Sequence, residues 1–246
     1  MDEKKNIYVS IVIPAYNEED RIVRTLENTF AYLKEQPYVA EVLVVSDGSK
    51  DKTVEMVCSI MPPANVSVLA LEYFPNRGKG YAVRYGMLKA EGEYVLFMDA
   101  DYSVPIEFVE PALALLQNGA DIAIASRRHP DSDVKNTQNF VRHMSSVLFN
   151  IAQAAYLGLH FKDTQCGFKM FKKVVAQDVV SQQKLNSVIF DPEILWIAQK
   201  KHCTIQEFPV TWVHDEDSRI QYDSLSKSLF IFQELFRIRS LHPDIR

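Results

Sequence analysis

The sequence has few cysteines and few glycines for its 246 residues. The three cysteines, Cys58, Cys166 and Cys203, are widely spaced and form no CxxC pair. An odd number at such spacing predicts neither a disulfide framework nor a zinc knuckle, and it favours a reducing, cytosolic setting. The eight glycines form neither the G-x-G-x-x-G of dinucleotide-binding folds nor the G-x-x-x-x-G-K-[ST] of P-loop proteins. These absences argue against dehydrogenases and P-loop enzymes.

Long apolar runs and an excess of basic charge are also absent. No stretch approaches the ~18 consecutive apolar residues of a membrane span, and the charged start of the chain, Met1–Asn6, is unlike a secretory signal. The net charge of −5 argues against a nucleic-acid partner, which would need a basic surface. We therefore expect a cytoplasmic protein that meets a membrane, if it does so, peripherally on the cytoplasmic face.

The sequence does contain a regular alternation of strand and helix patterns. Apolar, β-branched runs predict strands at 8–13, 41–45, 66–73 and 94–98, and helical patterns lie at 19–35, 52–60 and 80–90. This alternation predicts an α/β, Rossmann-like fold with a mostly parallel central sheet and helices on both faces. With 47% hydrophobic residues and no Gly/Ser-rich linker, residues 1–246 are expected to form a single domain.

The strand-like run Tyr94–Met98 ends abruptly in Asp99-Ala100-Asp101. Ligands of a parallel sheet gather at the C-terminal ends of its strands, so both carboxylates are expected at that edge. Two like charges so close raise each other's pKa unless a cation lies between them, and carboxylate oxygens favour Mg²⁺ or Mn²⁺. A solvated loop after a strand has the same short pattern, so the motif alone leaves both interpretations open.

Three further polar loops follow predicted strands and are expected at the same edge. They are Pro14-Ala15-Tyr16-Asn17-Glu18-Glu19, Ser46-Asp47-Gly48-Ser49 and Asn76-Arg77-Gly78-Lys79-Gly80. Glycines at 78 and 80 would let the backbone approach a nucleotide closely, while Lys79 or Arg84 faces its charge. A plain turn into a helix explains these glycines equally well.

Six segments, in order, resemble a known enzyme family. They are VSIVIPAYNEE at 9–19, VVSDGSKDKT at 44–53, NRGKGYAVRYGML at 76–88, FMDADYSVP at 97–105, ASRR at 125–128 and DTQCGFKMF at 163–171. Together they are similar to inverting family 2 glycosyltransferases, and within that family to the dolichyl-phosphate β-glucosyltransferases and polyprenyl-phosphate mannose synthases. The resemblance implies the glycosyltransferase-A fold, a nucleoside-diphosphate sugar donor, expected to be UDP-glucose, and a polyprenyl or dolichyl phosphate acceptor.

The resemblance also assigns residues to the donor. Asp99 and Asp101 would hold Mg²⁺ or Mn²⁺ against the leaving diphosphate, and Ser103 lies at a position that sometimes supplies a third ligand. The family usually has aspartate where this chain has Ser46, which leaves the choice between uridine and guanosine open. The implied nucleotide-sugar contacts are Pro14, Tyr16, Glu18, Asp47, Lys79, Arg84, Asp99, Ala100, Asp101, Gln165 and Arg219.

For the acceptor and the reaction, the resemblance implies Asp101, Asp191 and Arg127 as catalytic residues. Arg127 and Arg142 would bind the acceptor phosphate, because guanidinium groups bind phosphate in bidentate fashion. An ionised phosphate needs little help from a general base and much electrostatic positioning. Asp191 either contacts the sugar or acceptor or caps the helix that it opens. Cys166 is a poor candidate nucleophile because an inverting reaction needs no covalent intermediate.

Several alternatives stay open. A soluble glycosyltransferase with a hydroxyl acceptor would need a base, for which Asp191 is available. A non-catalytic nucleotide-sugar-binding protein would keep the fold without turnover, and a sugar-1-phosphate nucleotidyltransferase is disfavoured because its glycine- and arginine-rich N-terminal loop is missing. The stretch 225–241 predicts an amphipathic helix that lies either on an anionic membrane or on the protein core.

Overall fold

A computed structural model describes residues 6–135, 140–213 and 225–245, and for 140–146 and 225–228 it describes the backbone. The elements are β1 (Val9–Ala15), α1 (Ile22–Lys34), β2 (Ala40–Asp47), α2 (Thr53–Ser59), β3 (Val66–Tyr73), α3 (Lys79–Lys89), β4 (Tyr94–Met98), η1 (Ile106–Phe108), α4 (Val109–Gln117), β5 (Ile122–Ser126), β6 (Asp133–Lys135), α5 (Phe140–Leu157), β7 (Phe168–Lys172), α6 (Lys173–Gln182), α7 (Phe190–Lys200), β8 (Ile205–Pro209), β9 (Thr211–Val213) and α8 (Leu225–Leu241). Every strand and helix expected in the first hundred residues is present.

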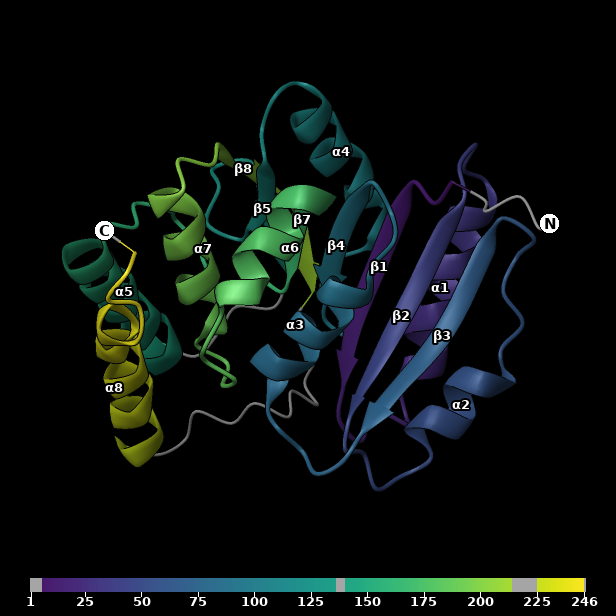
Figure 1. Cartoon of the computed structure of the whole chain (residues 1–246), viewed down its shortest axis with the longest axis horizontal. Coiled ribbons are helices and arrows are strands. Elements are labelled where there is room, and N and C mark those ends of the chain that lie inside the picture. The colour runs from purple at the N-terminus through teal and green to yellow at the C-terminus, as the bar shows by residue number, and fades with distance from the viewer. Residues whose placement is uncertain (1–5, 136–139, 214–224, 246) are drawn as a thin grey trace.

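Seven strands form one sheet in the order β3-β2-β1-β4-β7-β5-β8, which runs across the molecule (Figure 1). β7 is antiparallel to both of its neighbours, and the other pairs are parallel. The prediction of a mostly parallel sheet is therefore confirmed. Because Met98 of β4 pairs with Phe168 of β7, the segment before β7 lies at the edge where β4 ends.

Helices cover both faces of this sheet, as predicted. β1, β2, β4 and β5 are buried along their whole length, which suits strands that are covered on both sides. One core lies between the sheet and α1, α2 and α4, and a second core lies between the sheet and α3, α5, α6, α7 and α8. The edge strand β3 has several partly exposed residues.

Helix α1 begins at Ile22, three residues later than the sequence pattern predicts. The preceding residues are held by the loop after β2: the Glu18 N–H donates to Thr53 Oγ1 at 2.7 Å, and the Glu19 N–H donates to Asp51 Oδ2 at 3.1 Å. Asn17 has a positive φ of 55° and receives Lys50 N–H on its side-chain oxygen at 2.8 Å. These contacts hold residues 17–19 in a turn ahead of the helix, and they join the first two loops of the site edge.

Helices α5 and α8 lie side by side at the end of the molecule farthest from β3 (Figure 1). A short second sheet pairs β6 with β9 in parallel. Among the described residues, no helix combines the length and the apolar character that crossing a bilayer requires.

Candidate active site

Asp99 follows β4 and lies directly against the segment that precedes β7. Its N–H donates to the Gly167 carbonyl at 3.0 Å. A Cβ atom built on Gly167 would lie 2.0 Å from Asp99 Oδ2, so only glycine leaves room for this carboxylate. The chain thus brings residues 99 and 167 together because β7 is antiparallel, a relation that the sequence analysis did not foresee.

Lys79 supplies the positive charge beside Asp99. Its Nζ lies 2.6 Å from Asp99 Oδ1, in an ion pair without hydrogen-bond alignment. Lys79 begins α3, directly after Gly78, whose φ of 98° is one that other residues rarely adopt. Burial works against the charged form, but Asp99 and Asp191 raise the pKa of Lys79 above its ordinary value. The ammonium is therefore charged at neutral pH and faces Asp99.

Asp101 lies on the same short loop as Asp99. The Ser103 N–H donates to Asp101 Oδ1 at 2.9 Å, and Thr25 Oγ1 donates to the Ala100 carbonyl at 2.6 Å, which anchors the loop to α1. Burial, followed by the negative charge of Asp99, raises the pKa of Asp101. A carboxyl group in this state is one that a nearby cation would stabilise in its ionised form.

The two carboxylates fit a divalent cation that completes its ligand shell from a substrate. No group of three or more His, Cys, Asp or Glu side chains suited to a metal occurs within residues 6–135, 140–213 and 225–245. Mg²⁺ is commonly bound by one or two carboxylates together with substrate phosphates and water, so a two-carboxylate site matches its chemistry. Because Gly167 has no side chain, the Asp99 carboxylate has room at the sheet edge.

Lys169 is a buried cation that the sequence analysis missed. Its Nζ donates to Asp191 Oδ1 at 2.5 Å and to the Cys166 carbonyl at 2.7 Å, and the residue is fully buried. A lysine inside the apolar strand Phe168–Lys172 was the available signal, because a buried lysine requires a partner.

The capping interpretation of Asp191 is wrong. Helix α7 has Ile189 as its N-cap, and Asp191 lies inside the first turn with its side chain bonded to Lys169. Burial raises the pKa of Asp191, although Lys169 and Lys79 oppose this. Asp191 and Lys169 therefore form a buried pair next to Lys79.

Arg127 already has a carboxylate partner. Its Nε donates to Asp163 Oδ2 at 2.6 Å and its Nη2 donates to Oδ1 at 2.9 Å. Burial disfavours the charge, but Asp163 raises the pKa of Arg127, and Arg127 in turn holds the pKa of Asp163 below its ordinary value despite burial. The acceptor phosphate was the predicted partner of this guanidinium, and no role was predicted for Asp163.

Cys166 lies beside these charges and is buried. Burial, with a contribution from Asp163, raises the pKa of its thiol to about 12. Since the thiolate is the reactive form, this agrees with the expectation that Cys166 is no nucleophile.

In the loops expected to hold the nucleoside, one side chain is exposed and others already have partners within the protein. Tyr16 directly follows β1 and is 40% exposed, so its ring is open to a ligand. Asp47 is instead occupied: its two carboxylate oxygens accept the N–H groups of Arg77 at 2.6 Å and Gly78 at 2.9 Å. Asp47 therefore shapes the turn before α3, and Glu18 is paired with Arg21.

The remaining predicted residues lie at varied distances from this centre. Pro14 is part of the buried strand β1, and the Gln165 N–H donates to Asp163 Oδ1 at 3.2 Å. Arg84 points its Nη1 at the Gln183 carbonyl, 2.7 Å away, which places it in the support of α3. Arg142 belongs to α5, but its side chain and the whole of Arg219 lie outside the described residues.

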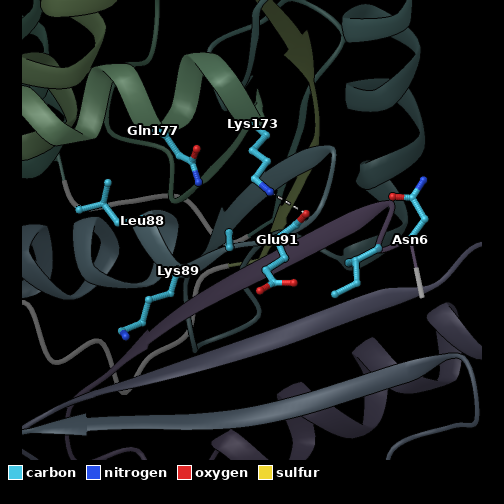
Figure 2. Close-up of a pocket in the computed structure, with 8 residues that line it drawn as sticks. Asn6, Leu88, Lys89, Glu91, Lys173 and Gln177 are labelled. Atoms are coloured by element: carbon cyan, nitrogen blue, oxygen red, sulfur yellow. Dashed lines mark hydrogen bonds between the residues drawn. The ribbon is translucent and has the colours of Figure 1, made fainter. Parts of the chain in front are cut away.

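A cavity of about 460 Å³ lies at the opposite edge of the sheet (Figure 2). It is lined by residues of the chain before β1, the end of α3 and the start of α6, and Lys173 Nζ donates there to the Glu91 carbonyl at 2.9 Å. None of the predicted site residues lines it. A second cavity, of about 490 Å³, lies between the turn 76–78, the loop 184–187 and α8, next to Lys79.

Comparison with known proteins identifies the family of this chain. The model described as "Glycosyl transferase family 2" matches residues 10–180, which include the loops after β1, β2 and β4 and the segment before β7. The chain belongs to glycosyl transferase family 2. It is therefore a glycosyltransferase, and the family resemblance drawn from its motifs is confirmed.

Relatives of this glycosyltransferase share most of its length. It is 34% identical to a dolichyl-phosphate β-glucosyltransferase of Dictyostelium discoideum, over 95% of this chain and 74% of the relative. It is 33% identical to the protein of that name from Homo sapiens, over 86% of this chain and 69% of the relative.

Solved structures show the same fold. Glucosyl-3-phosphoglycerate synthase from Mycobacterium tuberculosis, in complex with Mn²⁺, UDP and glucosyl-3-phosphoglycerate, matches with a TM-score of 0.65 at 16% identity, over 96% of this chain and 80% of the other. This likeness confirms the glycosyltransferase-A fold of the family 2 enzyme.

Proposed function

We propose that this glycosyltransferase moves glucose from UDP-glucose to a dolichyl or polyprenyl phosphate, with inversion at the anomeric carbon. The observation that carries the proposal is the partly buried cluster of Asp99, Asp101 and Lys79 in a chain 34% identical to a dolichyl-phosphate β-glucosyltransferase. We propose further that residues 1–246 act as one catalytic domain, peripheral on the cytoplasmic face of a membrane, because the acceptor is a membrane lipid.

In this proposal the donor binds at the C-terminal edge of β1, β2 and β4. The exposed ring of Tyr16 stacks on the base, and the turn that Asp47 organises passes close to the nucleotide. When the donor binds, the Lys79 ammonium leaves Asp99 and contacts the diphosphate, since it already faces the sheet edge. Mg²⁺ or Mn²⁺ bound to Asp99 and Asp101 would neutralise charge on the leaving diphosphate.

In this proposal arginine side chains bind the acceptor phosphate, and the reaction needs no general base. Asp163 engages Nε and Nη2 of Arg127, and no hydrogen bond of Nη1 occurs within the described part of the chain, so in this proposal the Nη1 donors bind the phosphate. Arg142 is proposed as the second phosphate contact. A lipid phosphate is ionised at neutral pH, so these residues need to hold it in line with the sugar and no side chain has to remove a proton.

A hydroxyl acceptor is the second candidate, and Asp191 favours it. Its pKa is raised by burial, which suits a general base. Against this role, Asp191 is 3% exposed and its Oδ1 already accepts from Lys169. The phosphate acceptor therefore agrees better with the site.

The proposal is tested by incubating the enzyme and a short polyprenyl phosphate with radiolabelled UDP-glucose, GDP-mannose or UDP-N-acetylglucosamine, with Mn²⁺ or Mg²⁺. Organic extraction then separates lipid product from donor. We expect label in the organic phase with UDP-glucose. Label from GDP-mannose instead would change the donor, and release of the nucleoside diphosphate without a lipid product would favour the hydroxyl acceptor.

A further inference from the structure

The loop 184–187, between α6 and α7, lies with its backbone against residues 78–80, which we call the glycine turn. The Gly80 N–H donates to the Asn186 carbonyl at 2.9 Å. A Cβ atom built on Gly78 would lie 2.4 Å from the same carbonyl oxygen, and one on Gly80 would lie 2.8 Å from another carbonyl oxygen of the loop. These contacts lie on both sides of Lys79, so a shift of the loop displaces the turn that carries this lysine.

Gln183 ties the same two segments together through its side chain. Its Nε2 donates to the Gly80 carbonyl and to the Leu185 carbonyl, each at 2.8 Å, and the residue is 1% exposed. One buried amide group therefore joins the glycine turn to the loop 184–187.

Glu193 holds this loop from the other side. Its Oε1 accepts the Lys184 N–H at 2.8 Å and its Oε2 accepts the Leu185 N–H at 2.9 Å, although the residue is fully buried. A buried carboxylate persists in a protein only when its oxygens have partners, and bonds to a charged acceptor are stronger than those to a neutral one. Glu193 also shares the first turn of α7 with Asp191.

His242, directly after α8, completes the shell of this carboxylate. Its Nε2 lies 2.7 Å from Glu193 Oε1, and because an ionised carboxylate can only accept, Nε2 is the donor. The His242 ring is 5% exposed and lies beside Trp196 of α7, with ring centroids 5.7 Å apart. The contacts thus run from the end of α8 through Glu193 and the loop 184–187 to the glycine turn.

We propose that Glu193 and His242 are positioning residues for donor binding, which act by holding the loop 184–187 against the glycine turn and so fixing where Lys79 begins. The Lys79 side chain is long and flexible, so the backbone at the start of α3 decides which atoms its ammonium reaches. Binding groups need to be held within about 0.5 Å of their working position. The proposal rests on the proposed function, in which Lys79 contacts the diphosphate of the donor.

The Kd for UDP in the presence of Mn²⁺, measured by isothermal titration calorimetry, tests this role. Glu193→Gln keeps the size of the side chain but turns an NH₂ group toward an N–H donor, and His242→Ala removes the ring. We expect each variant to raise the Kd at least about fivefold. His242→Gln, whose amide can replace Nε2 as the donor, should restore most of the affinity. His160→Ala, at an exposed histidine, is the matched control.

A double-mutant cycle with Lys79→Met separates positioning of this lysine from a general loss of structure. If Glu193 acts through Lys79, Glu193→Gln changes the Kd by less than about twofold once the ammonium is gone. An equal loss of affinity in both backgrounds would overturn the proposal, and so would wild-type affinity in Glu193→Gln and His242→Ala. Should Glu193→Gln fail to fold, the cycle with His242→Ala makes the same test.

Hydrogen exchange of the enzyme without donor makes the proposal and the proposed function fail separately. We expect faster exchange in residues 78–80 and 184–187 of Glu193→Gln and His242→Ala, with β1 unchanged. Unchanged exchange in the glycine turn would overturn the positioning role. Faster exchange there, in a protein whose wild type binds no UDP, would retain the positioning of the turn and overturn the proposed donor. UDP binding that Lys79→Met weakens but Glu193→Gln does not would retain the donor and overturn the positioning role.

Discussion

Opposite charges are paired around the site edge: Lys169 with Asp191 in full burial, and Lys79 with Asp99 and Arg127 with Asp163 in partial burial. Charges are costly to bury and persist in proteins when they are paired or used. Three such pairs within one region would provide fixed electrostatics for the two anionic substrates that we propose, a nucleoside-diphosphate sugar and a lipid phosphate.

Replacement of Asp101 by asparagine tests the metal assignment. Asp101→Asn keeps the size of the side chain and removes the charge that a divalent cation needs, so we expect transfer to fall at least about hundredfold. Initial rates measured across a Mn²⁺ titration check this. Asp131→Asn, at a carboxylate whose side chain is 79% exposed, is the control and should behave as wild type. Unchanged rates in Asp101→Asn would remove Asp101 from the metal site.

Replacement of Lys79 separates donor binding from fold. Lys79→Met removes the ammonium beside Asp99, and we expect the Kd for UDP in the presence of Mn²⁺ to rise about tenfold or more, with Lys79→Arg restoring part of the loss. Isothermal titration calorimetry gives both values. Lys89→Met, at the other end of α3, is the matched control. An unchanged Kd in Lys79→Met would show that this lysine serves Asp99 alone.

The Arg127–Asp163 pair predicts a pH-dependent stability. The pKa of Asp163 is lowered in the folded protein, so its contribution is present above the ordinary aspartate pKa and is lost as the pH falls through the lowered value. Asp163→Asn should therefore reduce the free energy of unfolding by about 3 kcal/mol at neutral pH, and by less in acid. Urea unfolding at several pH values measures the difference. A deficit that does not shrink in acid would contradict the pairing.

Sequence reasoning selected candidate residues from their positions at strand ends and helix starts, and it missed the ion pairs between distant residues. Asp99, Asp101 and Lys79 were predicted because each lies at the end of a strand or the start of a helix. The partnerships of Lys169 with Asp191 and of Arg127 with Asp163 span 22 and 36 residues, and no local pattern records them.

At the scale of elements, the direction of β7 decides the shape of the site. Alternating strand and helix patterns predicted β1 to β4 and their helices, but hydrophobic periodicity is the same for parallel and antiparallel strands. The antiparallel pairing of β7 with β4 was therefore not predictable from periodicity, although it brings Gly167 against Asp99.

A methyl group at position 167 tests this contact between elements. Gly167→Ala would place a Cβ 2.0 Å from Asp99 Oδ2, so the carboxylate must move and Mn²⁺-dependent transfer should fall at least about tenfold. The control is Gly119→Ala, where no atom lies within 4 Å of the added Cβ and the cost is backbone strain of about 1 kcal/mol. Thermal melts and initial rates of both variants distinguish the effects. Full activity of Gly167→Ala would show that Asp99 needs no fixed position.

At the scale of the whole molecule, the candidate active site and the cavity of about 460 Å³ lie at opposite edges of one sheet. The strand ends at one edge hold the charged cluster, whereas the cavity in Figure 2 belongs to the other edge and contains none of these residues. Helices α5 and α8 lie at the end remote from β3 (Figure 1). The fold class was predictable because each strand and helix carried its own signal, but the packing of α5 on α8 depends on contacts between segments about 80 residues apart.

The measurement that tests the account most directly compares two acceptors that differ by one phosphate. Initial rates of glucose transfer from UDP-glucose are measured with a polyprenyl phosphate and with the matching polyprenol, for the wild type and Asp101→Asn, with Mn²⁺. The account predicts product from the phosphate alone and a loss of that product in Asp101→Asn. Equal transfer to the polyprenol, or full activity of the variant, would contradict it.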